Sequence, residues 1–193
     1  GDTNNDGFID LLLGNGGPQM DRSEPLVVLE NDGNGHFRNV TFTAGLPPAG
    51  KSHGANLADL TGDGRLHLIS ASGGMYPGDL LTTSVYRPIA LPGNYLNVRL
   101  VGTRSNRDAI GARVTLTANG RDQHRLVNGG TGFGCLPLEQ HVGLGRGRAI
   151  DALEVWWPSG ARQRVQRPPV NATIEIVEGQ GGWTLVRKGP EPL

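Results

Sequence analysis

Oxygen-bearing side chains recur at alternate positions in the first ten residues of the chain. Asp2, Asn4 and Asp6 are followed at once by Gly7, and Asp10 comes just before a short apolar run. A hard cation such as Ca²⁺ takes roughly six to eight oxygen ligands, so a short loop must fold back to present them together. Gly7 permits that reversal because it lacks a Cβ. The spacing predicts a calcium-binding loop with four side-chain ligands.

The backbone carbonyl of Phe8 is the predicted fifth ligand, since it falls between Asp6 and Asp10. An EF-hand loop begins in the same way but ends with Glu at its twelfth position, where this chain has Leu13. The pattern therefore indicates a calcium loop that enters a β-strand. The alternative is a turn without metal, because Asn, Asp and Gly are frequent in turns. Crowded carboxylates repel one another without a cation, which favours the metal interpretation.

A second copy of the pattern appears when residues 1–17 are aligned with residues 58–74. Asp59, Thr61 and Asp63 keep the first three positions, but His67 stands where the first copy has its last Asp. A neutral imidazole is a poor ligand for calcium, so we expect this loop to bind weakly or to keep the turn without the ion. A repeat of this period is typical of propeller blades.

Charge divides the chain into two halves. Residues 1–93 hold 5 Lys and Arg against 10 Asp and Glu, and residues 94–193 hold 13 against 8. An acidic half followed by a basic half indicates two modules, the first suited to cations. The basic residues are scattered, which argues against nucleic acid as a partner. No run reaches the length of a membrane span.

The pattern of short apolar runs and turns predicts an all-β chain. We expect a repeat region at 1–76, a linker at 77–94, a β domain at 95–180 and a C-terminal tail at 181–193. The first part reads as a partial β-propeller-type repeat, about one blade plus part of another. The second reads as a β-sandwich or barrel of roughly seven or eight strands, in which Asn119-Gly120 marks a hairpin.

Both parts resemble known families. Residues 1–74 resemble the FG-GAP or VCBS repeats of integrin-α-type β-propellers, through the opening loop and the later turn at 31–37. Residues 95–179 resemble the ASPIC/UnbV domain, through the segments 105–114, 143–145 and 155–160. The departures are His67 in the second loop and the small number of repeats, because such propellers usually have about four to eight blades.

The resemblance implies a secreted or cell-surface calcium-binding protein with no established catalytic activity in its C-terminal domain. Because the chain begins inside a motif, any signal peptide would lie upstream. We expect a non-enzymatic extracellular protein that acts in adhesion, surface interaction or assembly. Its partners would be a protein or glycan at the cell surface, or further copies of itself. The alternatives are an accessory part of a polysaccharide-acting or biosynthetic enzyme, and a self-assembling structural subunit.

No catalytic residues are predicted, since no Ser, His and Asp stand at a recognisable spacing. Three residues of the second part are candidates for ligand binding. Arg107 and Asp108 could hold an anionic or sugar ligand, but we favour a structural role in which Asp108 pairs with Arg107 or Arg113, because Arg–carboxylate pairs are ordinary structural devices. Trp156 and Trp157 are adjacent, so in a strand they point to opposite faces, one into the core and one to the surface, where Trp156 is our candidate platform.

Overall fold

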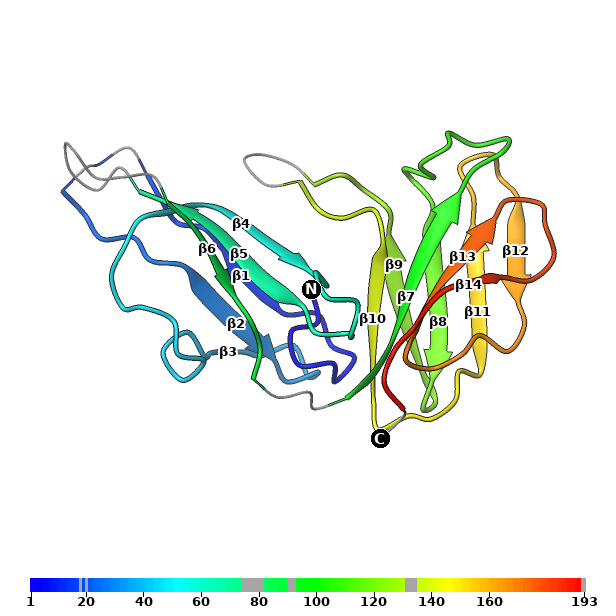
Figure 1. Cartoon of the computed structure of the whole chain (residues 1–193), viewed down its shortest axis with the longest axis horizontal. Helices are drawn as coiled ribbons and strands as arrows, with labels where there is room; N and C mark the ends of the chain where they lie inside the picture. The colour runs from blue at the N-terminus through cyan, green and yellow to red at the C-terminus, as the bar shows by residue number, and fades with distance from the viewer. Residues whose placement is uncertain (18, 20, 74–81, 90–92, 131–134, 192–193) are drawn as a thin grey trace.

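The computed structural model describes residues 1–193 except 18, 20, 74–81, 90–92, 131–134 and 192–193. Its strands form two parts that lie side by side (Figure 1). The first part contains β1 (Leu11–Leu13), β2 (Val27–Asn31), β3 (Phe37–Asn39), β4 (Ser52–Ala58), β5 (His67–Ser72) and β6 (Thr82–Tyr86). The second contains β7 (Asn94–Val101), β8 (Arg113–Ala118), β9 (Arg121–Leu126), β10 (Gln140–Gly145), β11 (Ala152–Trp156), β12 (Arg162–Val165), β13 (Ala172–Val177) and β14 (Thr184–Lys188).

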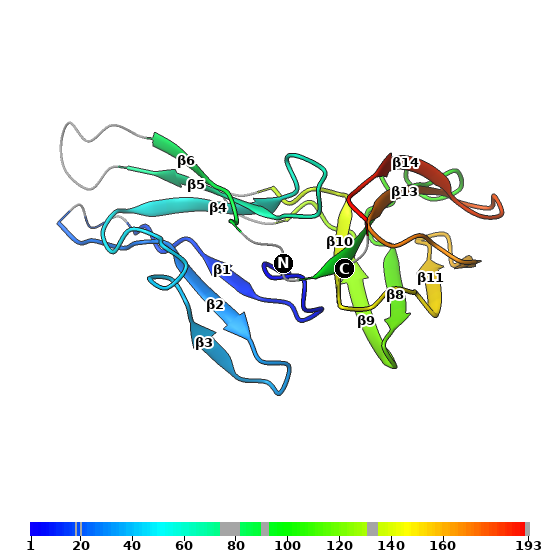
Figure 2. The ribbon, with the colours of Figure 1, turned by 60° about the horizontal axis from the view of Figure 1, so that its bottom comes forward.

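The first part consists of two three-stranded antiparallel sheets, β1-β2-β3 and β4-β5-β6. Figure 2 shows them as two layers, with β4-β5-β6 above β1-β2-β3. A small apolar core joins them, formed by Leu26, Val28, Leu46, Leu57, Leu66 and Leu68. The six strands of these two sheets are consistent with the predicted extent of about one four-stranded blade plus part of another.

Two predicted boundaries differ from the structure. Thr82–Tyr86 lies in the predicted linker at 77–94, yet it forms β6 and pairs with β5. Thr184–Lys188 lies in the predicted tail at 181–193, yet it forms β14 and pairs with β13. Both are edge strands with largely exposed side chains, so their sequences lack the alternation that marks a half-buried strand.

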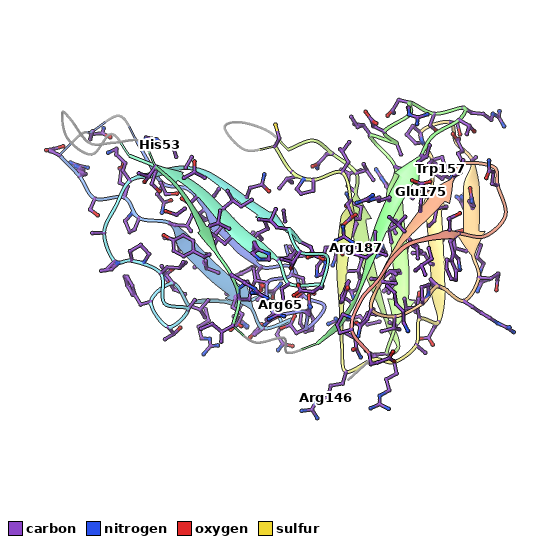
Figure 3. The ribbon with its side chains drawn as sticks, viewed as in Figure 1. His53, Arg65, Arg146, Trp157, Glu175 and Arg187 are labelled. Atoms are coloured by element: carbon purple, nitrogen blue, oxygen red, sulfur yellow. The ribbon has the colours of Figure 1, made fainter. Side chains whose placement is uncertain are left out.

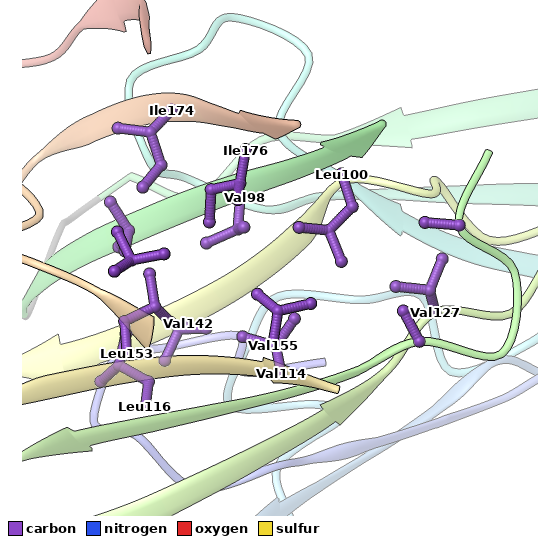
Figure 4. Packing of buried hydrophobic residues seen from close by; sticks show 14 of the residues in the cluster. Val98, Leu100, Val114, Leu116, Val127, Val142, Leu153, Val155, Ile174 and Ile176 are labelled. Carbon is purple, nitrogen blue, oxygen red and sulfur yellow. The ribbon is translucent and has the colours of Figure 1, made fainter. Parts of the chain in front are cut away.

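The second part is a sandwich of two four-stranded sheets, β10-β7-β13-β14 and β12-β11-β8-β9. All its pairs are antiparallel except β7 with β13, which is parallel. Its core is filled by Val, Leu and Ile from both sheets, including Val98, Leu116, Val142, Leu153 and Ile174 (Figure 4). The all-β prediction is therefore confirmed, and the described strands form sheets without closing into a barrel. No helix among the described residues is long and apolar enough to span a membrane.

Local signals place the strands of the sandwich as the sequence predicts. Asn119 and Gly120 join β8 to β9, with φ of 54° and 69°, the left-handed backbone that Asn and Gly tolerate best. Trp157 is buried, whereas its neighbour Trp156 keeps 41% of its surface exposed. The two indoles thus point to opposite faces, and Trp156 is the one available to a partner.

Candidate functional site

The first acidic loop is organised around the buried carboxylate of Asp2. Its Oδ1 accepts a hydrogen bond from the N–H of Asp6 at 3.1 Å, and its Oδ2 accepts one from the N–H of Gly7 at 2.8 Å. The chain reverses at Gly7, whose φ of 91° explains the need for glycine. Asp6 in turn accepts the N–H of Phe8 at 2.8 Å. The loop is therefore closed by its own carboxylates.

Asp10 ties the end of the loop to the neighbouring strand. One carboxylate oxygen accepts the N–H and the hydroxyl of Thr3, and the other accepts the N–H of Asn31 at 2.9 Å. Asn4 occupies the outer side of the loop, where its amide nitrogen lies 3.0 Å from both Asp6 and Glu30. The predicted side-chain ligands Asp2, Asn4, Asp6 and Asp10 thus belong to one short loop.

These residues fit a calcium ion in the chemistry of their donors. All are oxygen ligands, and among the residues that the structure describes, the carboxylates of Asp2, Asp6 and Asp10 make no ion pair. Burial, followed by repulsion from Asp6, raises the pKa of Asp2 to about 7. Within the described part of the chain, no three acidic, His or Cys side chains already gather as a metal-holding group. Calcium binding and the Phe8 carbonyl ligand therefore stay predictions.

The second loop neutralises its charge internally. Arg65 approaches Asp63 with its guanidinium at 2.9 Å, and Arg87 adds a longer contact of 3.8 Å. Asp59 is engaged by backbone N–H groups of its own loop, including that of Gly64 at 2.9 Å. Thr61 donates its hydroxyl to Asp63 at 2.8 Å. A fixed cation thus stands beside the carboxylate that a calcium ion would need.

Both loops pack against the second part of the chain at a surface that we call the junction. Asn5, in the first loop, donates its amide to the carbonyl oxygens of Gly64 at 2.9 Å and Gly93 at 3.3 Å. The backbone carbonyl of Asn5 accepts the N–H of Gly145, at the end of β10, at 2.7 Å. Arg121 reaches across to lie 3.8 Å over the ring of Phe8. The opening loop therefore packs directly against β9 and β10 of the sandwich.

His141 on β10 links the two loops through the sandwich. Its Nε2 lies 2.6 Å from Oδ1 of Asn5, and its Nδ1 lies 2.7 Å from Oδ1 of Asn97. Asn97 then donates to Asp59 of the second loop at 3.1 Å. Desolvation, with a smaller effect of Arg125, lowers the pKa of His141 to about 3. A neutral imidazole has one N–H, so it donates to only one of these two amide oxygens. Sequence reasoning missed this connection because Asn5 and His141 are 136 residues apart.

Small residues allow this close approach. A Cβ at Gly143 would lie 2.0 Å from Oδ2 of Asp2 and 2.7 Å from the backbone of Asn5. A Cβ at Gly64 would lie 2.1 Å from the ring of Tyr95, which stacks on His141 with centroids 5.9 Å apart. The two glycines therefore permit backbone and ring to meet across the junction.

The candidate ligand residues of the sandwich do not form one site. Arg107 and Asp108 are exposed, and Asp108 has no ion pair among the described residues, so the predicted pairing with Arg107 or Arg113 is wrong. The hollow that Trp156 lines contains neither Arg107 nor Asp108. Trp156 is therefore a surface residue that does not share a site with Arg107 and Asp108.

Glu178 is the residue that orders the loop after β7. Its Oε2 accepts the N–H groups of Thr103, Arg104 and Ser105 at 2.7–2.9 Å, and its Oε1 accepts the hydroxyls of Ser105 and Ser159. Burial alone would raise the pKa of Glu178, but these hydrogen bonds outweigh it and lower the pKa to about 2. This role was invisible in the sequence because the partners are 73–75 residues apart.

Comparison with known proteins gives two family matches and several relatives. The FG-GAP-like repeat family matches residues 2–70, and the ASPIC and UnbV family matches residues 102–182. The chain is 33% identical over 150 residues to cartilage acidic protein 1 of Mus musculus and over 153 residues to that of Homo sapiens. These alignments cover 75% and 77% of this chain, but it spans only 22% of the length of either relative.

Proposed function

Because this chain belongs to the FG-GAP-like repeat family over residues 2–70 and to the ASPIC and UnbV family over residues 102–182, we propose that it is part of a non-enzymatic, extracellular, calcium-binding protein. It would act in adhesion or surface interaction. The extracellular setting is drawn from the relatives, which are named cartilage acidic protein 1. The calcium proposal rests on the first loop.

The observation that carries it is the buried, unpaired carboxylate of Asp2 next to Asp6 and among further oxygen donors. A buried carboxylate without a counter-charge is costly, and the second loop avoids that cost with Arg65. The first loop has Phe8 at the position equivalent to Arg65, and the cations near it, Arg125 and Arg121, form no ion pair with its carboxylates among the described residues. A divalent cation bound by oxygen would supply the counter-charge.

Asp2, Asn4, Asp6 and Asp10 would hold the ion, together with the carbonyl of Phe8. Bound calcium would supply positive charge where the loop packs against Gly143 of β10. The chain's own residues do the rest: Thr3 and Asn31 hold Asp10 in place, and Asn5 fastens the loop to the sandwich. Calcium would therefore stabilise both the repeat and its attachment.

Thermal unfolding with and without calcium tests this proposal. A ligand that binds only the folded state raises stability by mass action, by about 2.7 kcal/mol at a hundredfold excess over Kd. We expect the melting temperature to fall when EDTA replaces calcium, and Asp6→Ala to remove most of that difference.

Asp63→Ala is the matched control, because it removes the equivalent carboxylate from the loop that Arg65 already neutralises. It should keep the full response to EDTA. An identical melting curve of the unmodified chain in saturating calcium and in EDTA would refute the calcium proposal.

A further inference from the structure

The outer face of the sheet β12-β11-β8-β9 carries a lateral row of four side chains, which we call the Trp156 row. Arg162 pairs with Trp156, Trp156 pairs with Arg113, and Arg113 pairs with Leu126. Directly paired residues of antiparallel strands point to the same face, so the four side chains stand in line. Arg162 and Arg113 are two strand intervals apart, about 10 Å. The row thus places an indole between two cations.

The indole is held in position from one side. The guanidinium of Arg162 lies 3.7 Å from the centroid of the Trp156 ring, and the indole N–H donates to Glu154 at 3.1 Å. The other side borders a hollow of ≈ 500 Å³ over β8 and β9, lined by Arg113, Thr115, His124, Arg125, Leu126 and Trp156. Trp156 is therefore a preorganised platform that faces an open space.

Positive charge on this face lacks internal partners. Among the described residues, Arg113, Arg162 and Arg164 form no ion pair. The carboxylates of the same face are Glu154, which bonds to the Trp156 indole, and Asp122, which accepts the hydroxyl of Thr117 at 2.6 Å. Two guanidinium groups without an ion pair, those of Arg113 and Arg162, flank the indole and favour an anionic ligand with a flat ring face.

We propose that the Trp156 row is a binding site for an acidic polysaccharide. A sugar ring would stack on Trp156 from the side of the hollow, and its carboxylate or sulfate groups would pair with Arg113 and Arg162. The hydroxyl of Thr115 and the imidazole of His124 would offer hydrogen bonds to the sugar. This deepens the proposed function by naming the ligand class of an adhesion protein, and it uses residues remote from the calcium loops.

The face suits a polysaccharide better than a protein or a nucleic acid. Protein interfaces are anchored by several apolar side chains in pockets, whereas this row has one exposed indole and Leu126. Single-stranded nucleic acids use several aromatic platforms for successive bases. The row also runs across paired strands, so it offers no free strand edge to a peptide at Trp156 or Arg113.

Isothermal titration of the full chain with heparin, hyaluronate and uncharged dextran tests the proposal. We expect the two acidic polysaccharides to bind, more weakly as salt rises, and dextran not to bind. Arg113→Ala and Trp156→Ala should each weaken binding about tenfold, the effect of losing one charge-assisted or stacking contact. Trp156→Phe, which keeps an aromatic ring, should retain more affinity than Trp156→Ala.

Arg146→Ala is the matched control, because Arg146 is exposed and projects away from the sheets (Figure 3). It should change the affinity by less than about twofold. Equal losses for Arg146→Ala and Arg113→Ala, unchanged binding by Trp156→Ala, or equal displacement of heparin by a single-stranded oligonucleotide would each overturn the proposal. Heparin titration in EDTA separates the two proposals, because heparin should bind with the same affinity with and without calcium. If the melting temperature does not respond to calcium, only the calcium proposal fails. If heparin does not bind, only the polysaccharide proposal fails.

Discussion

At the scale of single residues, the two loops of the repeat solve the same charge problem in different ways. Asp6 and Asp63 occupy equivalent positions, and two residues later the first loop has Phe8 where the second has Arg65. Arg65 pairs with Asp63 at 2.9 Å, whereas the ring of Phe8 packs under Arg121 of the sandwich. One substitution thus separates a self-neutralised loop from one that is open to a cation. The sequence analysis expects a weaker second loop from His67, and the ion pair of Arg65 with Asp63 is a further reason for that expectation.

Glu178 gives the sandwich a defined dependence on pH. Its pKa is about 2 in the folded chain against an ordinary value of 4.5, so the unfolded state binds a proton more readily between these values. The stabilisation by Glu178 is therefore complete above about pH 4.5 and is lost as the pH falls toward 2. We expect Glu178→Gln to lower the melting temperature at pH 7 and to flatten its decline between pH 5 and about pH 2.5.

Glu139→Gln is the comparison for this prediction, because Glu139 is also paired, with Arg99 at 2.6 Å, but on the sandwich surface. It should change the melting temperature little, as exposed ion pairs contribute about 0–1 kcal/mol. If Glu178→Gln and the unmodified chain lose stability in parallel over the acidic range, the assigned role of Glu178 is wrong.

At the scale of elements, the sequence predicted strands where the local signal was complete and missed contacts that depend on distant segments. Asn119-Gly120 predicted the hairpin of β8 and β9, and the adjacency of Trp156 and Trp157 predicted that one indole is buried and the other exposed. The sequence analysis did not predict β6 and β14, because these edge strands pair on one side only and have no row of buried apolar side chains. The sequence analysis also missed the packing of the opening loop against β10, because neither segment shows its partner in its own sequence.

The approach of β10 to the opening loop depends on the absence of a side chain at Gly143. A Cβ there would lie 2.0 Å from Oδ2 of Asp2 and 2.7 Å from the backbone of Asn5. We expect Gly143→Ala to destabilise the chain by about 1–3 kcal/mol, the usual cost of overpacking, measured by urea denaturation. Gly129→Ala is the control, because no atom lies within 4 Å of its Cβ position. Equal stability of the two variants would show that the loop does not seat on β10 as described.

At the scale of the whole molecule, we expect the junction to couple the unfolding of two parts that each have their own core. Asn5, His141, Asn97 and Asp59 form a continuous chain of contacts from the first loop through the sandwich to the second loop. Separating the parts would break the bond from Asn97 to Asp59 and the contact of His141 with Asn5. Family resemblance predicted both parts but not their union, because each motif describes its own segment and does not show that Asn5 meets His141 and Gly145.

The distribution of tryptophan makes this union measurable. Trp156, Trp157 and Trp183 are the 3 tryptophans of the chain, and all lie in the sandwich, whereas the proposed calcium loop lies in the repeat. Tryptophan fluorescence therefore reports unfolding of the sandwich, and far-ultraviolet circular dichroism reports both parts. If the junction couples them, the two probes should give coincident melting curves, and EDTA should shift both by the same amount. His141→Ala should separate the curves, because it removes the contacts to Asn5 and Asn97. A fluorescence transition that ignores EDTA while the dichroism transition moves would mean that the repeat and the sandwich unfold independently.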